Sequence, residues 1–241
     1  MPHTSNPSDP TPPSERPVAI VAGATSGMGL AIALDLATTH DVVAVGRTAA
    51  SVEALRLAGI TAVAVDLTDD GARAALAASV DRVDVVVHCA AVGQGLSIDE
   101  ATPEVWRSYL ELNVIAPADL TRLLLAPLRR ARGTVIFIGS GASTKAVPGS
   151  AVYTASKHAL RGFADVLRID EAPHGIRVAT VAPGQTDTPM LQRSIAAAGA
   201  AYEPERYITV ESVARAVRFV VDASPDVHLT DVAVRPRTEL R

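Results

Sequence analysis

The amino-acid sequence predicts an α/β fold: a single domain with a doubly wound, seven-stranded parallel sheet and helices on both of its faces. Two observations lead to this prediction. Short apolar, partly β-branched runs alternate with helical stretches from Arg16 onward, as expected for right-handed crossovers between parallel strands. The first of these runs, Val18 to Val21, ends in a glycine-rich turn that opens directly into a helix. The 241 residues suffice for one domain with a sizeable core, which we expect over residues 17–241.

The element boundaries follow from the apolar runs, their periodicity and the turn residues between them. We expect strands at residues 17–22, 41–46, 60–65, 83–88, 133–139, 175–181 and 228–235. We expect helices near residues 27–38, 49–58, 69–79, 103–128, 151–171, 188–199 and 210–222. Thr102 before Pro103 is typical of a helix N-cap with proline in the first helical position. Pro236 ends the last strand, as is common at a sheet edge.

Composition and charge exclude several classes of protein. The formal net charge of −4 and the lack of a basic run give no reason to expect nucleic acid as a partner. The single cysteine, Cys89, excludes an internal disulfide framework and suits a reducing compartment. The sequence has no apolar stretch of membrane-spanning length and no signal-peptide core, so we expect a cytoplasmic protein. Residues 1–16 are rich in proline, serine and threonine, and we expect them to form a disordered tail.

The turn after the first strand has the composition of a phosphate-binding loop. Gly23, Gly27 and Gly29 separate that strand from the following helix. The first N–H groups of a helix lie unpaired at the positive end of its dipole, so a pyrophosphate can bind there. Glycines let the backbone approach the phosphates and adopt positive φ. The same glycines could also serve only a tight turn, so the motif needs support from other residues.

The end of the second strand indicates which dinucleotide would bind. A site for NAD usually places a carboxylate there for the ribose, whereas here Gly46 is followed by Arg47. A guanidinium attracts the additional phosphate of NADP, so we expect NADP rather than NAD unless Arg47 is simply a solvated side chain. Ser26 and Thr48 could add hydrogen bonds. Asp66, at the end of the third strand, could accept from the adenine amino group or cap the next helix.

Three further residues have the character of a proton-transfer site. Tyr153 and Lys157 lie four residues apart in a predicted helix, so their side chains share one face. A phenol is a weak acid, and an ammonium group one turn away favours its anionic form. Ser140 ends the fifth strand, where open α/β sheets bind their ligands, and Ser143 is the competing hydroxyl. A Tyr-x3-Lys pair alone also arises by chance on helix surfaces.

The glycine turn, Asn113, Ser140, Tyr153 and Lys157 occur in an order and at separations that closely resemble the short-chain dehydrogenase/reductase family, which has the Rossmann fold. The resemblance covers essentially all of the chain from Pro17 to Pro236 and includes the segment PGQTDT at residues 183–188. It implies hydride transfer between NADP(H) and a carbonyl or secondary alcohol, with a small molecule as the partner. It also implies a homotetramer or dimer, formed through the helices near 103–128 and 151–171.

The resemblance implies a role for each residue of the set. Tyr153 would be the general acid in reduction and the base in oxidation, and Ser140 would hold the substrate oxygen. Lys157 would favour the phenolate and bind the nicotinamide ribose, while Asn113 would anchor a water that links this lysine to solvent. Thr188 would hold the carboxamide. The contacts with the cofactor are expected from Gly23, Thr25, Ser26, Gly27, Met28, Gly29, Arg47, Thr48, Asp66, Leu67, Ala90, Tyr153, Lys157, Pro183, Gly184, Thr186 and Thr188.

The chain departs from the family pattern after the fourth strand. Where many members carry Asn-Asn-Ala-Gly, residues 88–91 read His-Cys-Ala-Ala, which leaves the local hydrogen bonds of the central sheet open. We expect the cysteine, Cys89, to be an inert core residue rather than a nucleophile. No metal is expected, since hydride chemistry needs none and the six histidines show no ligand spacing.

Two other functions fit the same pattern. One is a dinucleotide-binding regulator without turnover, and the other is an epimerase or dehydratase on the same fold. The walls of a substrate pocket are expected at residues 93–96, 142–150 and 185–198, with Lys145, Gln192 and Arg193 as polar handles.

Overall fold

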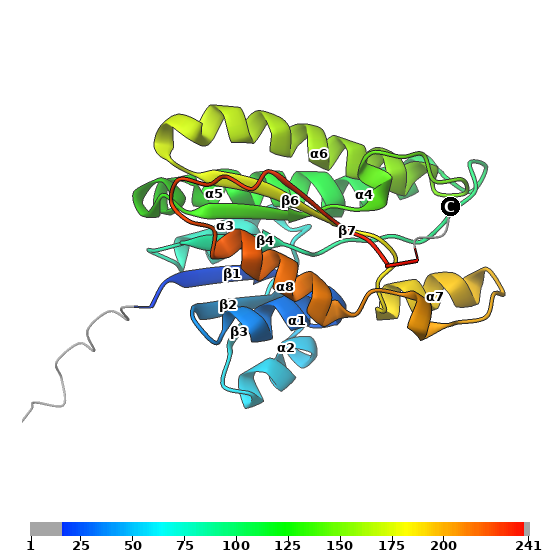
Figure 1. Cartoon of the computed structure of the whole chain (residues 1–241), viewed down its shortest axis with the longest axis horizontal. Helices are drawn as coiled ribbons and strands as arrows, with labels where there is room; N and C mark the ends of the chain where they lie inside the picture. Colours follow the sequence, from blue (N-terminus) through cyan, green and yellow to red (C-terminus); the bar gives the residue numbers. More distant parts are fainter. Residues whose placement is uncertain (1–15, 239–241) are drawn as a thin grey trace, which may run out of the picture.

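All seven strands run parallel in the computed structural model, in the order β3-β2-β1-β4-β5-β6-β7 (Figure 1). The structure describes residues 16–238, so the tail expected at residues 1–16 lies outside the described residues except for Arg16. The strands are β1 (Val18–Ala22), β2 (Asp41–Gly46), β3 (Thr61–Ala64), β4 (Val85–His88), β5 (Thr134–Ile138), β6 (Arg177–Pro183) and β7 (Asp231–Val234). The predicted doubly wound, seven-stranded parallel sheet is confirmed.

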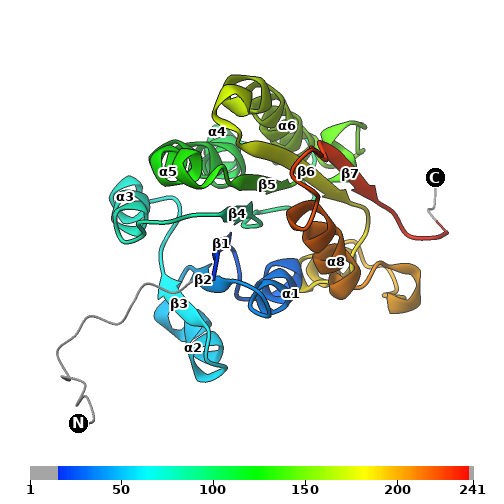
Figure 2. The same cartoon turned by 60° about the vertical axis from the view of Figure 1, so that its left-hand side comes forward.

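Helices cover both faces of the sheet (Figure 2). They are α1 (Gly27–Leu36), α2 (Ala49–Leu57), α3 (Asp70–Ala78), α4 (Pro103–Leu110), α5 (Ala116–Ala131), α6 (Ala151–Glu171), α7 (Pro189–Ala197) and α8 (Val210–Val221). Within residues 16–238, no helix is long and apolar enough to cross a membrane.

The strands feed two hydrophobic cores because successive side chains point to opposite faces of the sheet. Ala19 and Val21 of β1 belong to the core beneath α1, α2 and α8, which contains Ile32 of α1. Ile20 belongs to the core beneath α3, α5 and α6, which contains Leu124 of α5. Figure 2 shows these two groups of helices on opposite sides of the sheet. The strands therefore read as continuous apolar runs rather than as alternating ones.

The helix predicted at residues 103–128 is in fact two helices. The first of them, α4, ends at Leu110. A π-helical turn follows over Glu111–Ile115, and the second helix, α5, begins at Ala116. A π-helical turn closes its hydrogen bonds over five residues instead of four, which has no signature in composition or apolar periodicity. Asn113 lies buried in this turn.

The last strand is shorter than the predicted 228–235 because a side chain replaces its first residues. The N–H of Val178 in β6 donates to Nε2 of His228 at 2.8 Å, so β7 pairs with β6 only from Asp231 onward. As predicted, β7 is the edge strand of the sheet.

The carboxyl ends of the central strands lie side by side where the order of the sheet reverses. Ala22 of β1 pairs with Val45 of β2 on one side and with His88 of β4 on the other. His88 pairs in turn with Phe137 of β5. In open α/β sheets this reversal leaves a crevice beyond the strand ends, where ligands bind.

Candidate active site

The glycine turn between β1 and α1 is packed so tightly that side chains do not fit. A Cβ on Gly29 would lie 2.0 Å from the carbonyl oxygen of Gly23, well inside any allowed contact. The N–H groups of Gly23 and Ala24 both donate to the carbonyl of Val45, at 3.0 Å each, which fixes the turn against β2. The turn therefore presents backbone rather than side chains to the space beside it.

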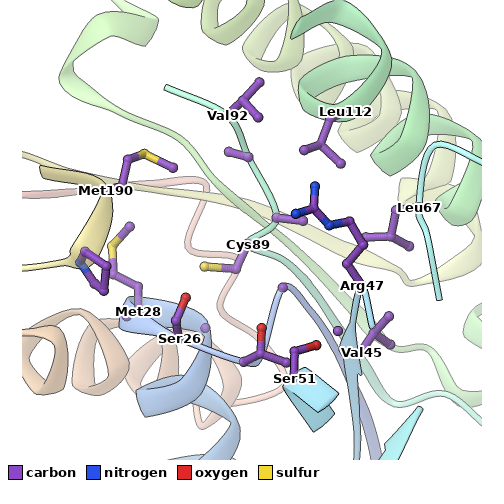
Figure 3. Close-up of a pocket in the computed structure, with 18 of the residues that line it drawn as sticks. Ser26, Met28, Val45, Arg47, Ser51, Leu67, Cys89, Val92, Leu112 and Met190 are labelled. Atoms are coloured by element: carbon purple, nitrogen blue, oxygen red, sulfur yellow. The ribbon is translucent and has the colours of Figure 1, made fainter. Parts of the chain in front are cut away.

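A cavity of about 480 Å³ opens beside this turn, at the carboxyl ends of the strands (Figure 3). This volume lies within the usual range for sites of small molecules and cofactors. Most of the residues predicted to contact a cofactor line it. These are Gly23, Thr25, Ser26, Gly27, Met28, Gly29, Arg47, Thr48, Asp66, Leu67, Ala90 and Thr188.

Five of the predicted cofactor contacts do not line the cavity: Tyr153, Lys157, Pro183, Gly184 and Thr186. Pro183 ends β6, and the N–H of Gly184 donates to the carbonyl of Val234 at 2.7 Å. The hydroxyl of Thr186 donates to the carbonyl of Gly184 at 3.0 Å. This part of the segment is thus bound to the C-terminal strand, and only its last residue, Thr188, reaches the cavity.

Sequence reasoning missed other parts of the cavity lining. Val92 follows β4, and Leu112 comes from the π-helical turn. Met190, from the first turn of α7 and within the substrate wall predicted at residues 185–198, also lines the cavity. Arg193, predicted as a handle for the substrate, also lines this cavity. The missed residues belong to different elements that meet only in the folded chain, so no local motif marks them.

The two ends of the cavity differ in character. In Figure 3, Arg47 and Leu67 lie at one end, Met28 and Met190 lie at the other, and Cys89 lies between them. Arg47 is exposed, and within the described part of the chain it has no hydrogen bond or ion pair. One end of the cavity thus carries an exposed cation, and the other end is lined by thioethers.

Asp66 is engaged by its neighbour rather than by the next helix. The N–H and the hydroxyl of Thr68 donate to Oδ1 of Asp66 at 2.9 and 2.7 Å, and these bonds lower the pKa of that carboxyl. The cap of α3 is Asp69, whose Oδ1 accepts from the N–H of Ala72 at 2.9 Å. Of the two roles left open for Asp66, capping the helix is therefore wrong.

Lys157 is buried beside Tyr153 and bonds only to a backbone carbonyl. Its Nζ donates to the carbonyl of Ile138, at the end of β5, over 2.9 Å. The same Nζ lies 5.8 Å from the centroid of the Tyr153 ring. Within residues 16–238, no carboxylate forms an ion pair with Lys157, so its charge is not neutralised by a neighbour.

Tyr153 lies next to the methionine end of the cavity but does not line it. A Cβ on Gly93 would lie 3.1 Å from Cε2 of Tyr153 and 2.9 Å from Sδ of Met190. Gly93 therefore lets the phenol ring and the thioether of α7 approach the same point of the chain. Since Met190 lines the cavity, it joins the cavity to the half-buried phenol.

The two candidate hydroxyls after β5 have different surroundings. Ser143 is 2 % exposed, and its Oγ accepts from the N–H of Ser140 at 3.1 Å. Ser140 is half-buried, and its Oγ accepts from the N–H of Ala142 at 3.1 Å. The hydroxyl proton of Ser140 has no acceptor in the described part of the chain. Ser140 is therefore the hydroxyl that can donate to a ligand.

A buried chain of hydrogen bonds connects the π-helical turn to the backbone of Tyr153. The amide of Asn113 accepts from the N–H of Val92 and donates to its carbonyl, both at 2.9 Å. It also donates to Oγ of Ser156 at 3.0 Å, and Ser156 donates to the carbonyl of Tyr153 at 2.8 Å. Ser156 is 0 % exposed and was not predicted, although it lies one helical turn from Tyr153. Together these bonds fix α6 to the segment after β4.

His88, the residue that ends β4, forms a buried hydrogen bond through its imidazole. Nε2 of His88 lies 2.8 Å from Oγ1 of Thr121, whose hydroxyl donates to the carbonyl of Pro117 at 2.7 Å. The imidazole must therefore donate through Nε2, and its ring stacks on Phe137 with centroids 5.0 Å apart. Burial lowers the pKa of His88 to about 3, so the ring is neutral. The open question about local hydrogen bonds is thus answered.

The thiol next to His88 has the properties of an inert cysteine. Burial raises the pKa of Cys89 to about 11, although the charge of Lys157 acts in the opposite direction. A thiol with this pKa is protonated near neutrality and is a poor nucleophile. Within the described ranges, no group of three or more His, Cys, Asp or Glu side chains could hold a metal ion.

Comparisons with known proteins agree with this geometry. The sequence matches the family model described as short chain dehydrogenase over residues 17–198. A Streptomyces virginiae protein named as a ketoacyl reductase of the monensin polyketide synthase is 38% identical over 200 residues, which are 77% of each chain. An uncharacterized short-chain type dehydrogenase/reductase of Sinorhizobium fredii is 32% identical over 91% of each chain. The structure of an actinorhodin polyketide ketoreductase with NADPH superposes with a TM-score of 0.83, at 28% identity, over 92% of this chain and 97% of the other.

Proposed function

The chain belongs to the short-chain dehydrogenase/reductase family, and on this basis we propose that it is an NADP-dependent oxidoreductase acting on a carbonyl or secondary alcohol. The observation that carries the proposal is the position of Tyr153 next to the cavity. Met190 lines the cavity, and a Cβ on Gly93 would lie 2.9 Å from its Sδ and 3.1 Å from the phenol ring, so a ligand that extends past Met190 would come to the tyrosine. A cation, Lys157, and a free hydroxyl proton, that of Ser140, lie on the neighbouring elements.

The cavity suits a dinucleotide. Its volume and its bare glycine turn fit a pyrophosphate beside the start of α1. Arg47 supports NADP over NAD. It lines the cavity where an NAD site has the carboxylate side chain that binds the ribose, and among residues 16–238 its guanidinium has no hydrogen bond or ion pair. When bound, the nicotinamide gives or takes the hydride, and the protein supplies orientation and a proton.

The proton in this scheme comes from Tyr153. In reduction its phenol donates to the developing alkoxide, and in oxidation its phenolate removes the alcohol proton. The ammonium of Lys157 favours the phenolate, and no carboxylate of the described chain forms an ion pair with it. Ser140 donates its free proton to the same substrate oxygen and so fixes that oxygen beside the phenol.

Asn113 contributes through its position in the π-helical turn. Both N–H groups of its side-chain amide are already bonded, to the carbonyl of Val92 and to Oγ of Ser156, so the water expected between Lys157 and solvent would donate to an oxygen of Asn113 rather than accept from its amide. The partner in this proposal is a small-molecule carbonyl or alcohol, and the enzyme forms a homotetramer or dimer as the family resemblance implies. The single cysteine supports a reducing, cytoplasmic compartment.

The test is the oxidation of NADPH in the presence of a panel of small ketones, measured as the loss of NADPH absorbance. Tyr153→Phe removes only the phenolic oxygen and should lower kcat by roughly 10²- to 10⁴-fold. Tyr207→Phe is the matched control, since Tyr207 stacks on Tyr202 and does not line the cavity. Equal turnover by Tyr153→Phe and the parent would refute the role of the phenol. A parent that binds NADPH but reduces no ketone of the panel would favour a regulator.

A further inference from the structure

Arg193 is a second cation at the cavity, and the proposed reaction has no role for it. It comes from α7, is exposed, and has no hydrogen bond or ion pair with any residue between 16 and 238. Its neighbour Gln192 is already bound, since Nε2 donates to Oδ1 of Asp187 at 3.0 Å. An arginine that lines a cavity without a carboxylate partner is free to bind an anion there.

The start of α7 lies directly against the glycine turn. A Cβ on Gly27 would lie 3.2 Å from the methyl group of Thr188, the residue that caps α7. Arg193 follows Met190 by three residues and Pro189 by four, so its side chain shares a face of the helix with both. All three line the cavity, which shows that this face of α7 is the one turned toward it.

Hydrogen bonds within the chain also hold α7 in this position. The hydroxyl of Tyr202 donates to Oδ1 of Asp187, the same oxygen that accepts from Gln192. Thr188 accepts from the N–H of Leu191 at 3.2 Å, which fixes the first turn of the helix. The base of the Arg193 side chain is therefore positioned before any ligand arrives, which lowers the entropic cost of binding.

The charges around the cavity favour a phosphate as the anion. Among the lining residues, Asp66 is the one carboxylate, and Oδ1 of this group is taken by Thr68. Arg47 and Arg193 are the two cations of the lining. Arg47 stands at the end of β2, whereas Arg193 stands on the element that contacts the glycine turn and, through Met190, the side of Tyr153. The group closest to that turn in a bound dinucleotide is its pyrophosphate.

We propose that Arg193 binds the pyrophosphate of the nucleotide from the α7 side, while Arg47 binds the additional phosphate of NADP. This inference rests on the proposed function, because it requires that the cavity bind NAD(P). It assigns different tasks to the two arginines. Arg193 strengthens the binding of NADPH and NADH equally, and Arg47 distinguishes between them.

The experiment measures the Kd of NADPH and of NADH by calorimetry, without a carbonyl substrate. Arg193→Ala should weaken both nucleotides by about tenfold and leave their ratio unchanged, as expected for one exposed charge-assisted contact. Arg193→Lys should recover part of the loss. Arg47→Ala should weaken NADPH selectively. Arg215→Ala, which removes an exposed arginine of α8 that does not line the cavity, should bind both nucleotides like the parent.

A fragment of the cofactor separates the two phosphate sites. Adenosine 2′-phosphate carries the additional phosphate but no pyrophosphate, so Arg193→Ala should bind it as the parent does. Unchanged Kd values for NADPH and NADH in Arg193→Ala would overturn the inference and leave the proposed function intact. A loss confined to NADPH would also overturn it, because Arg193 would then bind the additional phosphate. A parent that binds neither nucleotide would overturn both the inference and the proposed function.

Discussion

Two buried cations of this protein are compensated in opposite ways. Arg73 of α3 is 1 % exposed and bonds to Asp119 at 2.9 Å, to Glu111 at 3.4 Å, to Asp70 and to the carbonyl of Leu67. Lys157 of α6 is 4 % exposed and bonds to one carbonyl, that of Ile138. Both have lost most of their hydration, but only Arg73 has carboxylates in its place.

On the proposed function, the difference separates a cation that stabilises the fold from one that acts on the reaction. Burying a charge is costly unless partners replace its water, and three carboxylates do so for Arg73. The charge of Arg73 is consequently balanced by its own neighbours, and the residue joins α3 to the π-helical turn and α5. The charge of Lys157 is not balanced by a carboxylate of the described residues, and it acts on the Tyr153 ring beside it.

Of the two buried cations, Lys157 should have the larger effect on turnover, and Lys157→Met removes its charge but keeps the length of the side chain. We expect kcat to fall by about a hundredfold, since the phenolate loses its neighbouring cation. The free energy of unfolding should stay within about 1 kcal/mol of the parent, because an apolar group of similar size suits a buried site. Ketone reduction and urea unfolding of the same preparation test both statements. A large loss of stability with unchanged kcat would place Lys157 among the structural cations.

Arg73→Met should give the reverse result. Its carboxylates are left without their cation, and the free energy of unfolding should fall by about 2 kcal/mol while kcat per folded molecule remains that of the parent. Arg122→Met is the matched control. Arg122 binds the same Asp119 at 2.7 Å from an exposed position, so its loss should cost about 0.5 kcal/mol or less. Equal losses in the two variants, measured by urea unfolding, would show that burial of Arg73 adds nothing.

His88 is also buried, but it avoids the cost of a buried charge because its imidazole is neutral. We therefore expect the free energy of unfolding to decrease at acidic pH. The pKa of His88 is lowered from 6.5 to about 3 by burial, so below pH 6.5 the unfolded chain takes up a proton that the folded chain does not. His88 should therefore contribute full stability above pH 6.5 and lose it as the pH falls toward 3, by about 1 kcal/mol between pH 6 and 5.

His88→Gln identifies the source of that slope. A glutamine amide can take the place of Nε2 and donate to Thr121 but does not titrate, so the variant should lose less stability on acidification than the parent. His40 contributes the same slope in both proteins, since burial and the charge of Arg218 lower its pKa as well. Urea unfolding at pH 6 and pH 5 measures the difference. Parallel slopes for His88→Gln and the parent would contradict the neutral, buried imidazole.

Regular elements of this fold could be predicted because each leaves a local pattern. The parallel strands are buried on both faces and appear as apolar runs, and α6 lies at residues 151–171 as expected. The break between α4 and α5 could not be predicted, since the apolar face continues through Leu112 and Leu120 and a π-helical turn has no preferred composition. The short β7 was missed because His228, the first residue of the predicted strand, bonds to Val178 through its ring rather than through its backbone.

Part of the site could be predicted from the chemistry of single residues. Gly23, Gly27, Gly29 and Arg47 line the cavity as predicted, whereas the roles of Tyr153 and Lys157 stay predictions. What the sequence could not show is which atoms are already bonded. Ser140 and Ser143 are equivalent in the sequence, and the turn that buries Ser143 separates them. In the same way, the sequence suggests a substrate contact for Arg193, and the fold turns it toward the cavity beside the glycine turn.

The most direct test of the central claim is kcat for the reduction of one ketone, measured for the parent, Lys157→Met, Tyr153→Phe and the double variant. If Lys157 acts through Tyr153, the double variant should be no slower than Tyr153→Phe alone, because without the phenolic oxygen the charge has nothing to act on. Losses that multiply in the double variant would show that the lysine acts independently of Tyr153, and the account of this site would be wrong.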